Sequence, residues 1–128
     1  MIAARPPARR CRSTSGQATV EFALVLPLVV IMGYGLVVIG IAVRNELAVE
    51  LAAREGARAA AVSASPGAAA TAAATRAVRL PIEVATVDGG ATVTVTVTHT
   101  GSVDVAILGT LVGPVTHVAS VTMAVEPP

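Results

Sequence analysis

The sequence predicts an α+β protein: a long N-terminal transmembrane α-helix that extends out of the membrane, followed by a short helix and a small antiparallel β-sheet. Three observations lead to this prediction. An apolar run covers residues 22–43, an alanine-rich segment without strong helix breakers follows it, and the last third of the chain alternates valine with threonine. With 128 residues, the chain has room for one small domain beside the apolar run.

The apolar run from Phe22 to Val43 is 22 residues long and contains no ionisable side chain except the phenol of Tyr34. A helix of this length extends about 33 Å, which is enough to cross a hydrocarbon core of about 30 Å. The run is apolar on all sides, and such a helix belongs in lipid or at the centre of a large protein. Because this chain is too small to enclose it, we expect a single membrane span.

Arginine is distributed unevenly along the chain. Four of the nine arginines precede the span with no acid among them, whereas from Gln17 onward five arginines face eight acidic residues. A basic cluster before a span stays in the cytoplasm, so we expect the N-terminus inside and the C-terminal region outside the cytoplasmic membrane. The alternative, an arm that binds nucleic acid, is disfavoured by the adjacent span. The four leading arginines are Arg5, Arg9, Arg10 and Arg12.

Small residues suggest where the long helix makes close contacts. Gly33 and Gly40 lie seven residues apart in the span and share a face, which allows close helix packing. Beyond the span, residues 44–62 contain no breaker except Gly56, and we predict one helix over about 19–61. Its small residues recur every four positions, and two uses of this stripe are open: bundling with other chains, or packing on the chain's own C-terminal domain. The stripe consists of Ala48, Ala52, Gly56 and Ala60.

The C-terminal part of the chain changes from a helical to a strand pattern. A Ser-Pro-Gly break precedes an alanine-rich helix expected over 68–80, with Arg76 and Arg79 in its last turn before Pro81. A strand is expected over 82–87. The remaining expectations are a turn at Asp88-Gly89-Gly90, a half-buried strand over 91–100, a further strand candidate at 103–105, an apolar loop over 106–115 and a last strand over 116–125. We expect three or four antiparallel strands packed on the long helix.

Nothing in the sequence indicates catalysis. His99 and His117 are the only histidines, have no cysteine or carboxylate at ligand spacing, and are expected on the surface of strands. No serine, threonine or cysteine has the setting of an activated nucleophile, and Cys11 is the only cysteine. One phenylalanine, one tyrosine and no tryptophan leave no platform for stacking bases. We therefore expect no enzyme, no cofactor, no metal and no nucleic-acid partner.

Glu21 stands at the threshold of the apolar run, and no cation occurs in the four residues that follow it. A carboxylate at the edge of a bilayer is costly unless it meets water or a partner. Two interpretations are open: Glu21 meets water among the lipid headgroups, or it meets a positive charge from a neighbouring chain. Gly16 lies between the basic head and Glu21, either as a simple loop glycine or as part of a recognition motif.

The basic head, Gly16, the sequence Gln-Ala-Thr-Val-Glu-Phe and the span together resemble the processing site of type IV prepilins in its short Tad/Flp form. A longer similarity is to TadE-like pseudopilins, whereas residues 63–115 carry no such resemblance. The similar segments are GQATVEFALVLPL (16–28), AAREGARAAA (52–61) and SVTMAVE (120–126).

The resemblance implies that a prepilin peptidase cleaves between Gly16 and Gln17. Glu21 becomes the fifth residue of the product and its carboxylate a counter-charge in assembly, while Phe22 takes the place where major Flp pilins usually have tyrosine. The implied fold is pilin-like. The implied division is a cleaved basic leader at 1–16, a transmembrane and extended helix at 17–62, and an extracytoplasmic α+β domain at 63–128.

The resemblance also implies a function. A minor pseudopilin of this kind contributes to the assembly of a Tad/Flp-type pilus or a related secretion system. Its implied partners are the membrane, the prepilin peptidase, other pseudopilins, the major pilin and the assembly platform with its ATPase. The alternative is an uncleaved single-span protein that displays a small β domain as a structural or adhesive module.

Overall fold

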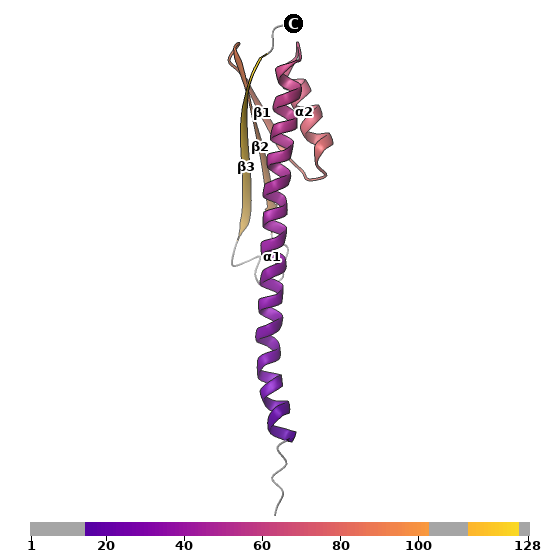
Figure 1. The fold of residues 1–128 in the computed structure, drawn as a ribbon, viewed down its shortest axis with the longest axis vertical. Coiled ribbons are helices and arrows are strands. Elements are labelled where there is room, and N and C mark those ends of the chain that lie inside the picture. Colours follow the sequence, from indigo (N-terminus) through magenta and orange to yellow (C-terminus); the bar gives the residue numbers. More distant parts are fainter. Residues whose placement is uncertain (1–14, 103–112, 126–128) are drawn as a thin grey trace, which may run out of the picture. The chain divides into compact units, whose positions relative to one another are not determined.

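The computed structural model describes residues 15–102 and 113–125 of the chain. In order, the elements are helix α1 (Ser15–Ala61), helix α2 (Pro66–Ala77) and strands β1 (Glu83–Asp88), β2 (Thr92–Ser102) and β3 (Pro114–Ala124) (Figure 1). The three strands form one antiparallel sheet in the order β1-β2-β3. The predicted α+β class, with a long N-terminal apolar helix, a short helix and an antiparallel sheet, is therefore confirmed.

The chain divides into two compact units, and α1 runs through both. The first unit ends at Val37 and the second begins at Val38. The helix starts four residues before the predicted position and ends at Ala61, as expected. Pro27 lies inside it, where it leaves one backbone carbonyl without its usual i+4 donor.

Helix α2 begins two residues earlier and ends three residues earlier than predicted. Pro66 occupies its first position, where the fixed φ angle of proline favours a helix and its missing N–H is not needed. The helix ends at Ala77 because Val78 turns to an extended conformation and packs against the core. Arg76 lies in the last turn as expected, but Arg79 lies outside the helix, which corrects the prediction.

The turn between β1 and β2 forms where the Asp-Gly-Gly sequence predicts it. Gly90 has a φ angle of +79°, which a residue without Cβ adopts easily. The Asp88 carboxylate accepts a hydrogen bond of 2.8 Å from the Gly90 amide, and the Gly89 amide donates one of 2.8 Å to the Thr92 carbonyl. The candidate strand at 103–105 and most of the expected loop at 106–115 lie outside the described residues, and Pro114 and Val115 belong to β3.

The two faces of β2 differ as the alternation predicts. Val93, Val95 and Val97 are fully buried, whereas the intervening threonines face the other side of the sheet. On that outer face, threonine hydroxyls pair across the β2–β3 ladder, at 2.8 Å for Thr94 with Thr122. The hydrophobic face therefore points inward and the hydroxyl face outward.

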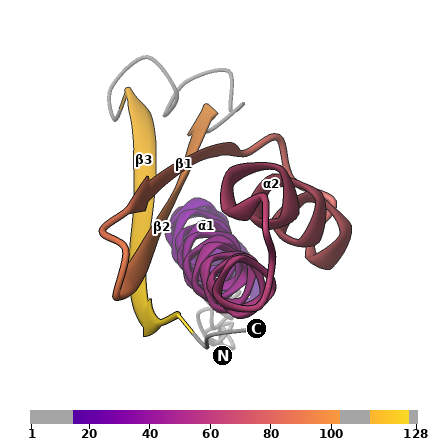
Figure 2. The same ribbon diagram turned by 90° about the horizontal axis from the view of Figure 1, so that it is seen from above.

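The core of the second unit is built from small side chains. Residues of α1, α2 and β2 form one buried cluster, and α2 contacts β1 and β2 directly; Figure 2 shows both helices beside the sheet. Small side chains let the two helices and the sheet approach closely, which partly replaces the burial that larger residues give. The buried residues are Val49, Ala52, Ala53, Ala57, Ala60 and Ala61 of α1, Ala70 and Ala74 of α2, and Val93, Val95 and Val97 of β2.

Candidate membrane and assembly site

The apolar part of α1 has no buried residue: from Phe22 to Val43, each residue is exposed or half-buried. In the described part of the chain, one helix is long and apolar enough to cross a membrane, and none of its most apolar 18-residue window is buried. Phe22, at the start of this segment, is 65% exposed, and Leu24 is 72% exposed. So large an apolar surface is compatible with a single-pass membrane protein, because lipid can cover what the chain itself leaves bare.

The predicted processing residues lie at the beginning of this helix. Gly16 and Gln17 are in the first turn of α1, so in the uncut chain their backbone is helical. The Gln17 side-chain amide donates a hydrogen bond of 3.1 Å from Nε2 to Oε1 of Glu21, one turn further along. Glu21 thus has a partner within its own chain, which the sequence pattern alone does not indicate.

The structure separates the predicted helix-packing residues into two groups. A Cβ built on Gly33 or Gly40 meets no atom within 4 Å, so these positions are open. Ala52 and Ala60, in contrast, are fully buried in the core of the second unit. Gly56 lies with them, where a built Cβ would come within 3.2 Å of Val95 Cγ1. The stripe could bundle with other chains or pack on the chain's own C-terminal domain. In the structure, these three residues pack within the chain.

The histidines are buried, which contradicts the prediction of surface positions. His99 and His117 are 4% and 8% exposed, lie opposite each other in the β2–β3 register, and stack with ring centroids 6.3 Å apart. Nδ1 of His99 bonds to the carbonyl oxygen of Pro81 at 2.7 Å, and Nδ1 of His117 bonds to Oε2 of Glu46 at 2.7 Å. Buried polar groups need such partners, and these bonds explain how the rings fit on the inner face.

Sequence reasoning misses Glu46 as a partner because 71 residues separate it from His117. For His99, the sequence does contain one local signal. His99 follows Val93, Val95 and Val97 at the same two-residue spacing, which places it on the buried face of the strand. The predicted surface position of His99 assumes instead that a polar side chain must be exposed.

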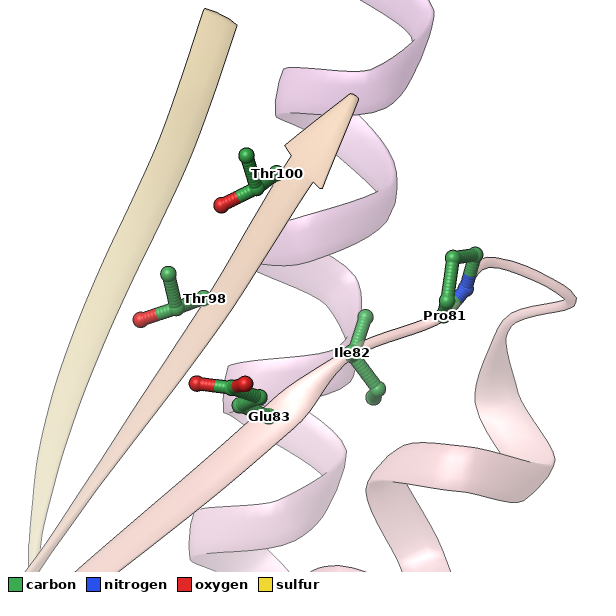
Figure 3. A pocket seen from close by; sticks show the side chains of 5 residues that line it. All are labelled: Pro81, Ile82, Glu83, Thr98 and Thr100. Atoms are coloured by element: carbon green, nitrogen blue, oxygen red, sulfur yellow. The ribbon is translucent and has the colours of Figure 1, made fainter. Parts of the chain in front are cut away.

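No catalytic arrangement is found among the described residues. They contain no group of three or more histidine, cysteine or acidic side chains that could hold a metal. A cavity of about 240 Å³ lies where β1 begins beside β2 and is lined by Pro81, Ile82, Glu83, Thr98 and Thr100 (Figure 3). Glu83 and Thr98 are register partners there, so a carboxylate does lie beside these hydroxyls. Both histidines occupy buried inner positions, so no histidine joins them to complete a set of nucleophile, base and orienting group.

Taken together, these features define a class of protein: an exposed N-terminal helix of membrane-spanning length, joined to a small α+β unit. The model of one protein family, described as TadE-like protein, matches residues 16–58, which are 43 of the 128 residues. Over this segment the chain is similar to TadE-like proteins, which confirms the resemblance there. No curated protein and no solved structure matches the chain.

The matched segment covers Gly16, Glu21, the whole apolar run and most of the stripe of small residues. It therefore contains the predicted processing and assembly residues, while the sheet and α2 lie outside it. The match indicates a protein related to Tad pili.

Proposed function

We propose that this chain is a minor pseudopilin of a Tad/Flp-type pilus or a related secretion system. It is inserted in the cytoplasmic membrane with its N-terminus inside, cut after Gly16 by a prepilin peptidase, and contributes to pilus assembly without enzymatic activity. The observation that carries this proposal is Glu21, which stands five residues after Gly16 at the start of an exposed apolar helix within the TadE-like segment.

The chemistry of the cut supports an assembly role for Glu21. Cleavage removes all four leading arginines and leaves a new amine on Gln17. This amine can carry a positive charge at the same depth as the Glu21 carboxylate of a neighbouring subunit. In a medium of low dielectric constant, each charge is more stable beside the other than alone.

The helical position of Gly16 and Gln17 is consistent with processing if the first turn opens. The first amide groups of a helix have no partner within it, so its end frays at little cost. Unwinding at this point leaves the rest of α1 intact. We therefore place the peptidase substrate in a frayed state of the first turn.

The proposed partners are the prepilin peptidase, other pseudopilins, the major pilin and the assembly platform with its ATPase. Phe22 lies next to Glu21 and is exposed, and Gly33 and Gly40 are open positions further along α1. None of these three residues belongs to the buried core of the described chain. We assign them to contacts with lipid or with the helices of neighbouring subunits.

Intact-mass measurement of the membrane-extracted protein tests the proposal. In cells with an active prepilin peptidase, we expect a chain that begins at Gln17. Glu21→Ala should still be cut but should enter assemblies poorly, because it lacks the counter-charge. A chain that retains Met1 to Gly16 in such cells would instead identify an uncleaved anchor with a displayed domain, and unchanged piliation in the variant would remove the counter-charge role.

A further inference from the structure

We infer that Glu21 protects the new N-terminus of its own chain from cyclisation by holding the Gln17 side chain. The inference rests on the proposed function, since only the cut after Gly16 makes Gln17 the first residue. It assigns Glu21 a second role, within the subunit, in addition to its proposed role between subunits. Glu21 acts here as a positioning residue.

An N-terminal glutamine can react with itself. The lone pair of its amine attacks Cδ of its own side chain, the new N–Cδ bond closes a five-membered ring, and the Cδ–Nε2 bond breaks. Nε2 takes up a proton from the amine and leaves as ammonia. The product is a neutral lactam, so the chain loses the positive charge that the proposed pairing with a neighbour requires.

The hydrogen bond between Gln17 and Glu21 opposes this ring closure. Nε2 of Gln17 lies 3.1 Å from Oε1 of Glu21, which is four residues further along the helix. The bond extends the glutamine side chain along α1, whereas cyclisation requires Cδ to fold back to the backbone nitrogen of the same residue. A side chain cannot adopt both conformations at once, so the bond must break before the reaction.

The surroundings favour the bond. The acceptor is a carboxylate, and hydrogen bonds to charged acceptors are stronger than neutral ones. The neighbouring side chains Val20 and Phe22 are apolar and 60% and 65% exposed, so lipid around them would lower the local dielectric constant and strengthen the bond. Side-chain pairs one turn apart on an exposed helix face contribute about 0.2–0.5 kcal/mol, and about 0.4 kcal/mol corresponds to a protection of about twofold.

The two roles of Glu21 are compatible. A carboxylate offers about four acceptor positions on its two oxygens. The Gln17 amide occupies one of them on Oε1. Oε2 can therefore receive the amine of a neighbouring subunit while the amide remains bound.

The experiment follows ammonia loss from the processed chain. The full-length protein is produced together with its prepilin peptidase, extracted from membranes in mild detergent and incubated, and samples are weighed by intact-mass spectrometry over time. The native chain is compared with Glu21→Ala, which removes the acceptor, and with Glu21→Gln, which keeps an uncharged acceptor of the same length. Gln17→Ala is the control, because alanine cannot form the ring.

We expect the native chain to lose ammonia most slowly, Glu21→Ala to lose it about twice as fast, and Glu21→Gln to fall between them. The control should show no loss. Equal rates in the native chain and in both variants, all beginning at residue 17, would overturn the inference and leave the proposed function standing. A native chain that does not begin at Gln17 would overturn both.

Discussion

At the scale of single residues, Gly56 decides how closely α1, α2 and the sheet can approach one another. A Cβ built at this position would lie 3.2 Å from Val95 Cγ1, 3.3 Å from the Ala70 carbonyl oxygen and 3.5 Å from Ala74 Cβ. These atoms belong to β2 and α2, so α1, α2 and the sheet meet here. The glycine costs helix propensity, and close packing of the layers offsets that cost.

We predict that Gly56→Ala lowers the free energy of unfolding, while Gly67→Ala does not. Alanine at position 56 gains up to about 1 kcal/mol in helix propensity but crowds its neighbours at a cost of about 1–3 kcal/mol. Gly67 is also helical, but a Cβ there meets nothing within 4 Å, so only the smaller propensity gain applies. Urea unfolding of the detergent-solubilised chain measures the difference.

The comparison of the two variants isolates the packing term, because both exchange a helical glycine for alanine. Gly67 lies in the first turn of α2, where alanine gains less helix propensity than in a helix interior. We therefore expect the free energy of unfolding of Gly56→Ala to lie about 1–2 kcal/mol below that of Gly67→Ala. If Gly56→Ala were as stable as Gly67→Ala, the layers would be packed more loosely than the structure shows.

At the scale of elements, a polar contact attaches the inner face of β3 to α1. His117 lies on β3 with its side chain 10% exposed, and its Nδ1 is 2.7 Å from Oε2 of Glu46 on α1. Nearby, His99 bonds to the Pro81 carbonyl and thereby attaches β2 to the segment before β1. The inner face thus changes along β2, from valines packed on alanines to histidines held by hydrogen bonds.

We predict that Glu46→Ala destabilises the chain by about 1–3 kcal/mol, because it leaves the buried imidazole of His117 without its partner. Glu46→Gln should retain most of the stability, since its amide oxygen can still accept the bond. Thermal or urea unfolding provides the measurement. Glu50→Ala is the matched control on the same helix: Glu50 pairs with Arg54 at 3.2 Å, and that partner is 68% exposed, whereas the partner of Glu46 is buried.

An exposed pair of this kind contributes about 0.5 kcal/mol or less, so Glu50→Ala should change stability little. Losses of equal size in Glu46→Ala and Glu50→Ala would contradict the attachment of β3 through His117. If Glu46→Gln keeps its stability, the hydrogen bond to His117 stabilises the chain and the negative charge of Glu46 is not needed.

The elements that can be predicted from the sequence are those with a local signal. The apolar run, the Val-Thr alternation and the Asp-Gly-Gly turn each lie within a few neighbouring residues, and each predicts its element correctly. The predicted end of α2 is too late because Val78 leaves the helix to pack on residues distant in the sequence. The pairing of Glu46 with His117 has no local signal at all, since it depends on how β3 docks on α1.

At the scale of the whole molecule, the spacing of Gly16, Glu21 and the span predicts a processing site, but the geometry of these residues cannot be predicted from that spacing. Gly16, Glu21 and the span follow one another along one segment, so the resemblance is visible in the sequence alone. The hydrogen bond between Gln17 and Glu21 depends instead on the first turn of α1 being helical, which the expected start of the helix near residue 19 does not include. The proposed protection of the new N-terminus rests on this hydrogen bond.

The last prediction concerns the orientation of the whole chain in the membrane. The cluster of four arginines before the span should keep the N-terminus in the cytoplasm, so the second unit should lie outside. Cys11 is the only cysteine and lies among these arginines, which makes it a natural reporter of that side. In cells without the prepilin peptidase, a maleimide that cannot cross membranes should label Cys11 only after the cytoplasmic membrane is opened.

A second variant reports the opposite side. Cys11→Ser combined with Ala72→Cys moves the thiol to an exposed position on α2. In protoplasts or spheroplasts with an intact cytoplasmic membrane, this chain should be labelled, while the chain with Cys11 alone should not. The reverse pattern would place the basic head outside. It would also refute processing by a peptidase that acts on the cytoplasmic side of the span, because Gly16 would then lie on the wrong side of the membrane.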